Sequence, residues 1–186
     1  MNIFRLSFLL SFILVSSCGA PPVVKENDPS LARYGEFLLY RGEKFNGILE
    51  TRLDAVQVLR RTPYRNGLAH GTEIETYQTG QEAASREYSN GKKEGLHLGY
   101  YEDGKRRFSY SYRNDEFDGD FWEWYPSGAL YIYAKFEKGQ ALGRKVWRED
   151  GQIYINAVYF NGQMYGLPGS KLCRQVRSDS GRTSSM

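Results

Sequence analysis

The sequence contains few residues of the kinds that build metal and redox sites. Its 186 residues include only two cysteines and two histidines. His70 and His97 are far apart in sequence and neither is near Cys173, so no metal-ligand spacing is present. A phosphate-binding Gly-Lys-Ser/Thr motif and a nucleophile motif are also missing. We therefore predict a protein that is not an enzyme, with no catalytic residues, metal or cofactor, and with both histidines at the surface.

Strong charge and long apolar runs are scarce as well. The formal net charge is +3 with both signs mixed along the chain, which argues against nucleic-acid binding. The one long apolar run, residues 6–15, is about half of the roughly 20 residues that a membrane-spanning helix needs. A cluster of acidic residues has the composition of a paired-carboxylate site or a Ca²⁺ site, but it straddles an expected turn, where solvated acidic residues are common, and we favour the solvated turn. The cluster consists of Asp115, Glu116, Asp118, Asp120 and Glu123.

The N-terminus has the features of a secretory signal. Arg5 precedes the apolar run, and small residues follow the run up to Cys18. The segment Val15-Ser16-Ser17-Cys18 resembles a bacterial lipobox. The resemblance implies a lipoprotein signal peptide at residues 1–17, lipidation of Cys18 by palmitate-type chains, and a membrane anchor in the cell envelope, with Gly19 favouring the outer membrane. The alternatives are an ordinary signal peptide and an uncleaved anchor.

The segment after Cys18 is expected to hold the folded domain away from the bilayer. Three prolines and mixed charges between residues 19 and 30 disfavour regular structure. We therefore predict a lipid-anchored flexible linker at residues 18–33. If Cys18 carries lipid, Cys173 has no partner for an intramolecular disulfide.

Most of the remaining chain is a repeat. An aromatic residue, two residues, a glycine, three residues and a second glycine recur along it. The second glycine stands at positions 71, 95, 119, 143 and 166, at intervals of 24, 24, 24 and 23 residues, after an irregular copy that ends at Gly47. A fixed period of this length predicts tandem structural units.

Each unit has the pattern of a β-hairpin. Asn-Gly or Asn-Asp marks one turn, and a glycine at position 80, 104, 128 or 151 marks the other. Between the turns, large and small residues alternate with the period of a strand that buries one face. We expect the buried face to carry a ladder of aromatic and aliphatic side chains. Its expected members are Leu98, Tyr100, Phe108, Tyr110, Tyr112, Trp122, Trp124, Ile132, Ala134, Phe136, Trp147, Ile155, Ala157 and Tyr159.

The pattern Tyr-x-Asn-Gly-x-x-x-Gly, followed by aromatic pairs and a second glycine turn, resembles the MORN repeat. The similarity is to the variant found in bacterial proteins labelled antitoxin-like, and it extends from Tyr40 to Gly166. We place a domain of about five units at residues 34–166. The resemblance implies an all-β fold, in which tandem β-hairpin (MORN-like) repeats form an elongated, twisted antiparallel sheet.

Two features stand out from the repeat. Aromatic residues that should point away from the ladder form a candidate interaction patch, unless residues 37–40 or the C-terminus cover them. The patch consists of Phe121, Tyr125, Tyr131, Tyr133 and Tyr154. Residues 167–186 are expected to form a cap loop and a polar tail. Within them, Cys173 is a candidate thiol or soft-metal ligand beside basic residues, or an inert capping residue.

Together these features predict a non-enzymatic envelope lipoprotein that uses a MORN-like β-repeat surface for protein–protein interaction. The expected partners are an unknown protein and the membrane, through the N-terminal lipid, with no nucleic acid, and we expect a monomer. One alternative is an immunity or antitoxin-like protein that neutralises an envelope-acting toxin. Another is a metal or thiol-redox accessory protein that works through Cys173.

Overall fold

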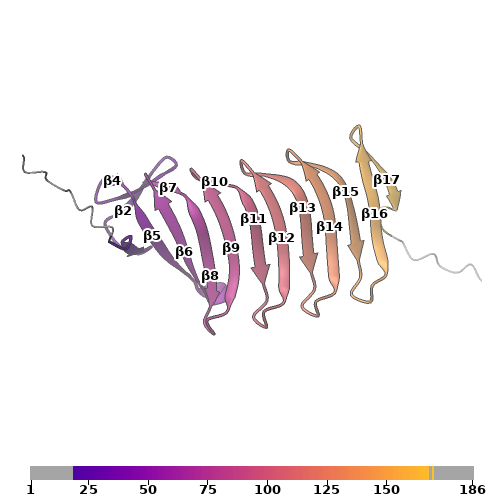
Figure 1. Cartoon of the computed structure of the whole chain (residues 1–186), viewed down its shortest axis with the longest axis horizontal. Coiled ribbons are helices and arrows are strands. Elements are labelled where there is room, and N and C mark those ends of the chain that lie inside the picture. The colour runs from indigo at the N-terminus through magenta and orange to yellow at the C-terminus, as the bar shows by residue number, and fades with distance from the viewer. Residues whose placement is uncertain (1–18, 168, 170–186) are drawn as a thin grey trace, which may run out of the picture.

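A computed structural model describes residues 19–167 and residue 169, and it shows an all-β protein built on one long sheet (Figure 1). The sheet follows the order β1-β5-β6-β8-β9-β11-β12-β13-β14-β15-β16-β17, and β1–β5 is its one parallel contact. Its strands are β1 (Val23–Lys25), β5 (Gly47–Leu53), β6 (Val58–Arg65), β8 (Gly71–Tyr77), β9 (Glu82–Ser89), β11 (Gly95–Tyr100), β12 (Arg106–Arg113), β13 (Glu116–Trp124), β14 (Leu130–Glu137), β15 (Gln140–Trp147), β16 (Ile153–Phe160) and β17 (Gln163–Leu167). Two short strands, β7 (Leu68–Ala69) and β10 (Lys92–Lys93), pair with β6 and β9. The predicted fold class is confirmed.

Two kinds of turn alternate along the sheet. At the Asn-Gly turns both central residues have positive φ, as at Asn90 (50°) and Gly91 (85°), which matches the right-handed twist of the flanking strands. At the other end, the N–H of Gly128 donates to the carbonyl of Tyr125, and the N–H of Tyr125 donates to the carbonyl of Ala129. The first hairpin replaces this turn with the short 3-10 helix η1 (Asp54–Val56).

A tyrosine before three of the glycine turns connects neighbouring hairpins. The hydroxyl of Tyr77 donates to the carbonyl of Tyr100 at 2.9 Å, and Tyr101 donates to Trp124 at 2.6 Å. Tyr125 repeats the contact with Trp147 at 3.0 Å. These bonds satisfy backbone carbonyls at the glycine-turn end of the hairpins. They also join neighbouring hairpins at this end, in addition to the backbone pairing between strands.

The N-terminal segment is ordered and caps the sheet, which corrects the prediction of a flexible linker at residues 18–33. Within the described part of that range, β1 pairs with β5, and β2 (Leu31–Tyr34) begins a small second sheet. This sheet continues through β3 (Phe37–Tyr40) and β4 (Glu43–Lys44). Burial explains the order, since an apolar cluster joins the segment to the main sheet. The cluster consists of Val24, Leu38, Phe45 and Leu49.

A bulge at the glycine-turn end of the hairpins sets which side chains share a face. Glu123 pairs with Ile132 and Trp124 pairs with Leu130, which leaves Tyr131 as an extra residue. The same irregularity follows Glu75, Gly99 and Val146 in their hairpins. One extra residue on one strand shifts its alternation relative to the partner strand. The predicted ladder did not allow for this extra residue. Its face assignment was therefore wrong for the strand that precedes each glycine turn.

The corrected faces follow from the register. We call the face that carries Phe108, Tyr110 and Ala134 the first face and the opposite one the second face. Trp122 lies opposite Ser109 and Tyr133, which places it on the second face. Leu98 also lies opposite Ser109, and alternation places three further members of the predicted ladder on the second face. These are Tyr100, Trp124 and Trp147.

The first face is the core of the main sheet. Its large side chains lie over small ones, so that Ala134 and Ala157 are only 5% and 3% exposed although no second layer of described residues covers them. Rings stack along it, with centroids of Phe108 and Tyr110 4.5 Å apart. Buried side chains of the main sheet lie on this face or at a bulge. They are Val24, Leu49, Val58, Thr62, Glu73, Glu75, Ala83, Ala84, His97, Phe108, Ala134, Val146 and Ala157.

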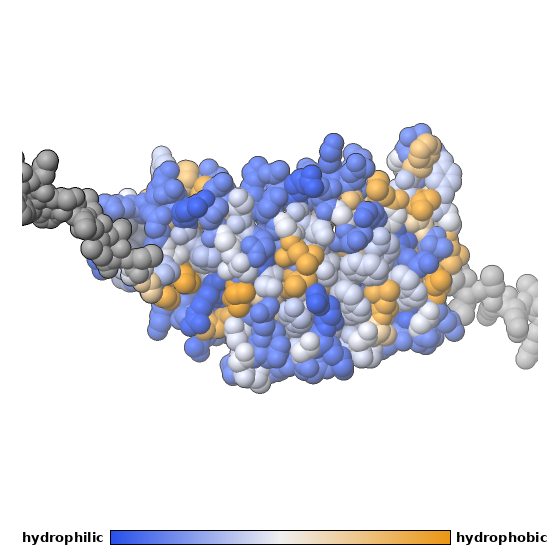
Figure 2. All heavy atoms as spheres, in the orientation of Figure 1, coloured by the Kyte–Doolittle hydropathy of each residue, from blue (hydrophilic) through white to orange (hydrophobic). Residues whose placement is uncertain are grey.

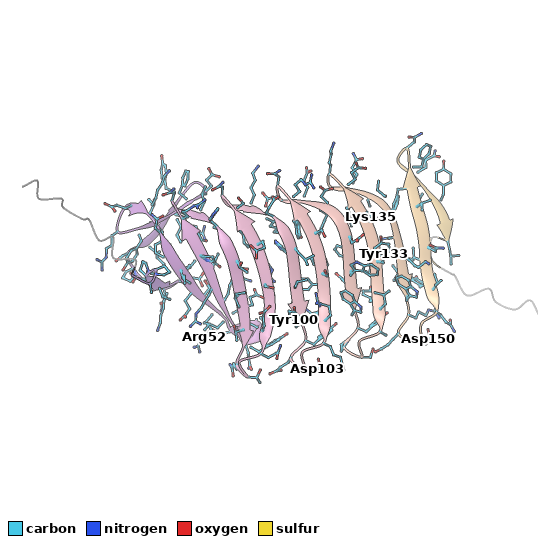
Figure 3. All side chains as sticks on the ribbon, in the orientation of Figure 1. Arg52, Tyr100, Asp103, Tyr133, Lys135 and Asp150 are labelled. Atoms are coloured by element: carbon cyan, nitrogen blue, oxygen red, sulfur yellow. The ribbon has the colours of Figure 1, made fainter. Side chains whose placement is uncertain are left out.

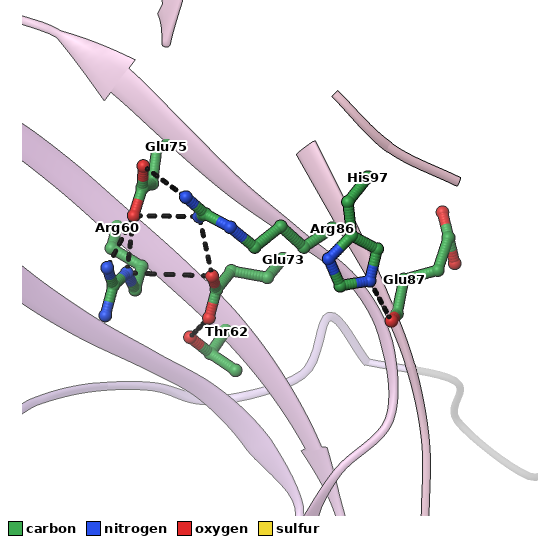
Figure 4. Close-up of polar contacts among 7 residues, drawn as sticks. All are labelled: Arg60, Thr62, Glu73, Glu75, Arg86, Glu87 and His97. Carbon is green, nitrogen blue, oxygen red and sulfur yellow. Dashed lines mark hydrogen bonds and ion pairs between the residues drawn. The ribbon is translucent and has the colours of Figure 1, made fainter. Parts of the chain in front are cut away.

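Between β6 and β9 the first face carries a network of charged side chains (Figure 4). Arg60 contacts Glu75 at 2.6 Å, Arg86 contacts Glu73 at 3.1 Å, and the hydroxyl of Thr62 donates to Glu73 at 2.6 Å. Burial by itself would raise the pKa of Glu75, but the hydrogen bonds and charges of Arg86 and Arg60 bring that pKa below its usual value. The buried charges are therefore paired within the network.

His97 lies beside this network and is buried, so the prediction of two surface histidines is wrong for it. Its side chain is 2% exposed, and its ring centroid is 4.5 Å from that of Tyr112. Its Nε2 lies 2.9 Å from the carbonyl oxygen of Glu87, which a neutral imidazole can satisfy by donating a hydrogen bond. Burial lowers the pKa of His97.

Candidate functional site

The predicted interaction patch does not form one surface. Phe121 lies on the first face, with its ring 4.2 Å from that of Tyr110. Tyr125 uses its hydroxyl in a bond to the next hairpin, and its ring packs 4.8 Å from Tyr131. Tyr131 is a bulge residue, and by the same register irregularity so is Tyr154, which is 40% exposed.

Tyr133 keeps its predicted place on the second face, where it belongs to a different set of aromatic residues (Figure 3). Its ring centroid lies 4.1 Å from that of Trp122, and Trp122 lies 6.1 Å from Trp124. Tyr133 also pairs across strands with Lys145, which precedes Trp147 by two residues on the same face. We call Trp122, Trp124, Tyr133 and Trp147 the second-face aromatic surface, and all four are partly exposed.

A groove of about 440 Å³ continues this surface toward the C-terminal hairpin. Tyr133 and Trp147 form its aromatic part, and Leu142 and Val158, which are 42% and 57% exposed, extend its apolar wall. Gly143 also lines the groove and has no side chain to fill it, and a Cβ there would lie 3.0 Å from the carbonyl oxygen of Ala157. The groove is thus shaped by one missing side chain amid aromatic and aliphatic neighbours.

Two lysines line the groove. The ammonium of Lys135 contacts Asp120 at 3.1 Å, and the same carboxylate accepts the hydroxyl of Tyr133 at 3.1 Å. Burial, and then the bond to Asp120, raises the pKa of Tyr133, so the phenol stays protonated and acts as a donor. Lys145 lies 5.6 Å from the ring centroid of Trp147 and has no ion pair among the described residues.

The arrangement has the composition of a binding surface. Exposed Trp and Tyr side chains supply large apolar contact areas at little cost in conformational entropy, and they dominate the energetics of protein interfaces. A lysine without an acidic partner beside them favours a ligand that carries a carboxylate. The groove therefore fits an extended apolar segment with an acidic residue.

Sequence reasoning missed Trp122, Trp147 and Lys145 because of the bulge. The signal that could have found them is the glycine at positions 104, 128 and 151, since a turn that ends in a left-handed glycine adds one residue to the following strand. The acidic cluster was expected to consist of solvated turn residues. Glu123 does not fit this expectation, because it accepts a hydrogen bond from the hydroxyl of Tyr110 at 2.5 Å.

Other predicted sites fall outside what the structure covers. Cys18 and Cys173 both lie outside the described residues. Within residues 19–167, no three His, Cys, Asp or Glu side chains lie close enough together to hold a metal ion. No helix in the described part of the chain has the length and apolar character needed to cross a bilayer.

No protein-family model matches the chain, and no curated protein is significantly similar to it.

Proposed function

We propose that this protein is a non-enzymatic lipoprotein of the bacterial cell envelope, made of MORN-like repeats, whose second face binds another protein. One observation carries the proposal. The buried side chains of the main sheet lie on the first face or at a bulge, whereas three tryptophans and a tyrosine remain partly exposed together on the second face, beside the groove. Aromatic residues left at a surface in a cluster are typical of binding sites.

The lipobox-like segment supports the proposed location. An anchored Cys18 would precede β1 by only a few residues, so the capped end of the sheet would be held near the membrane and the rest would extend from it. Labelling cells with a clickable palmitate analogue tests the anchor. The wild type should take up label and Cys18→Ala should not, while equal labelling of both would exclude lipidation at Cys18.

The binding surface is tested by quantitative co-purification from envelope extracts. Trp147→Ala removes an aromatic anchor, and Lys145→Glu reverses the groove's lysine charge. Tyr34→Ala is the matched control, because Tyr34 is 77% exposed at the opposite end of the molecule. We expect one protein to be recovered with the wild type and Tyr34→Ala and to be at least about tenfold depleted with both groove variants. Equal recovery with all four proteins would contradict the proposal, provided circular dichroism shows that each variant folds.

A further inference from the structure

Exposed apolar side chains are concentrated in the last hairpin. Of the 13 large apolar residues of the described chain that are exposed, seven lie in β16 and β17. They are Ile153, Tyr154, Val158, Phe160, Met164, Tyr165 and Leu167, with exposed fractions of 40–67%. Figure 2 shows hydrophobic residues at this end of the molecule, and smaller hydrophobic patches over the middle and the N-terminal part of the same view.

The last hairpin has apolar residues at two positions where the preceding unit has charged ones. Three residues before the Asn-Gly turn, Val158 stands where the preceding unit has Lys135. Directly before the turn, Phe160 stands where the preceding unit has Glu137. Both earlier residues are exposed and charged, so the repeat itself does not require an apolar residue at either place.

The outer edge of β17 is also open. Among the described residues, no strand pairs with β17 on the side away from β16. Since the hairpin turn is two residues long, Gln163 and Tyr165 bond to β16, which directs the backbone groups of Met164 and Gly166 to the open edge. The strand contains no charged residue, although charges are the usual protection of an exposed edge.

We propose that two copies of this chain associate edge to edge through β17, in antiparallel orientation, and form one continuous sheet. This inference does not depend on the proposed partner-binding function. A second copy is the occupant that the edge favours, because an uncharged strand with outward backbone groups is complementary to itself and a repeat array needs a cap at each end. The edge at the other end, β1, is less suited to such pairing because it is only three residues long and contains Lys25.

The geometry of the pairing is specific. The two-fold axis passes beside Tyr165, so that Met164 of each copy exchanges backbone hydrogen bonds with Gly166 of the other. Tyr165 then faces Tyr165 of the second copy, with Cα atoms about 4.5 Å apart as in a non-hydrogen-bonded pair. The axis is perpendicular to the sheet, so both second faces point the same way. Val158 and Tyr165, which are paired on that face, continue into the same residues of the second copy as one apolar row.

The oligomeric state tests the proposal. Full-length protein, solubilised in a mild detergent, is analysed by sedimentation over a range of concentrations. We expect a reversible dimer whose Kd rises at least about tenfold in Val158→Lys/Phe160→Glu. This variant carries the side chains that the preceding unit has at these positions, so it should fold. The matched control, Tyr34→Glu/Val56→Lys, introduces the same charges at exposed apolar positions far from β17 and should leave the Kd unchanged.

A cysteine pair tests the register. In a Cys173→Ser background, Tyr165→Cys should form an intermolecular disulfide under mild oxidation, because the facing Cα atoms lie within bridging distance. Gln163→Cys is the control, since in this register it faces Leu167 of the second copy and its own counterpart is too distant. A wild type that is monomeric at micromolar concentration, or equal cross-linking at both positions, would overturn the proposal. If residues 170–186 occupy the edge of β17 in place of a second copy, the protein will be monomeric, and that result would also overturn the proposal.

Discussion

Gly99 offers a sharp test of the claim that the first face is a core in its own right. The residue lies opposite both Ala84 and Phe108 on that face. A Cβ at Gly99 would lie 2.6 Å from Cζ of Phe108 and closer still to two other atoms of the ring. The ring has little room to move, because Phe108 is 8% exposed, stacks on Tyr110 at 4.5 Å and has the guanidinium of Arg107 5.1 Å from its centroid.

Gly99→Ala should therefore destabilise the protein although alanine suits a strand better than glycine. Overpacking a core typically costs about 1–3 kcal/mol, and removing a glycine from a strand returns about 0.5–1 kcal/mol. We expect a net loss of about 1–2 kcal/mol. Phe108→Ala alone should cost about 3–5 kcal/mol.

The double variant separates overlap from other causes. In a Phe108→Ala background the ring is gone, so Gly99→Ala should become neutral or slightly stabilising. Urea unfolding followed by circular dichroism measures all four proteins, and the cycle should give a coupling of about 1–3 kcal/mol. A Gly99→Ala variant as stable as the wild type would refute the reasoning, as would an equal cost in both backgrounds.

Four further predictions use the same unfolding assay. Lys138 has a φ of 48° at a turn position where other units have Asn, so Lys138→Asn should stabilise by about 0.5–1 kcal/mol, and a loss would contradict the turn assignment. Tyr101→Phe should cost about 0.5–1.5 kcal/mol by leaving the carbonyl of Trp124 without its donor. Arg86→Met should cost about 3–5 kcal/mol because it leaves the two buried carboxylates, Glu73 and Glu75, with Arg60 as their one remaining ion-pair partner, whereas Arg61→Met, which removes an exposed pair with Glu50, should cost less than about 1 kcal/mol. The pKa of His97 lies below its unfolded value of about 6.5, so its contribution to stability should be fully present above pH 6.5 and fall as the pH drops toward the folded pKa; His97→Gln should flatten that pH dependence, and an unchanged slope would show that His97 is not the titrating group.

The strand pattern of this fold could be predicted because turn chemistry is local. Asn90-Gly91 and its counterparts require positive φ at two consecutive residues, and few residue types accept it. Strict alternation around Phe108, Tyr110 and Tyr112 then indicates strands of one length. Hairpins joined in sequence order produce the sheet without any long-range information.

The face of the sheet on which each side chain lies could not be predicted in the same way. A single bulge residue, such as Tyr131, reverses which residues before the turn share a face with those after it. The predicted faces of Phe121 and Trp122 were interchanged for this reason alone. The candidate patch therefore contained one correct member of the second-face aromatic surface, Tyr133, and it lacked Trp122, Trp124 and Trp147.

Order at the N-terminal end was missed for a different reason. Prolines and mixed charge near Val23 and Val24 are typical of a linker, but the burial of Val24 against Leu49 is a tertiary contact that composition does not reveal. Likewise, His97 is an ordinary polar residue in sequence, and only the neighbouring rings of Tyr88 and Tyr112 exclude it from solvent.

The most direct test of the account compares two neighbouring residues that point to opposite faces. Arg144 lies opposite Ala134 on the first face, and Lys145 lies opposite Tyr133 on the second. A photo-cross-linking phenylalanine analogue is placed at each position in turn and irradiated in living cells. We predict a cross-linked protein partner from position 145 and none from position 144. Equal cross-linking from both positions, or cross-linking from position 144 alone, would contradict the claim that the second face is the binding surface.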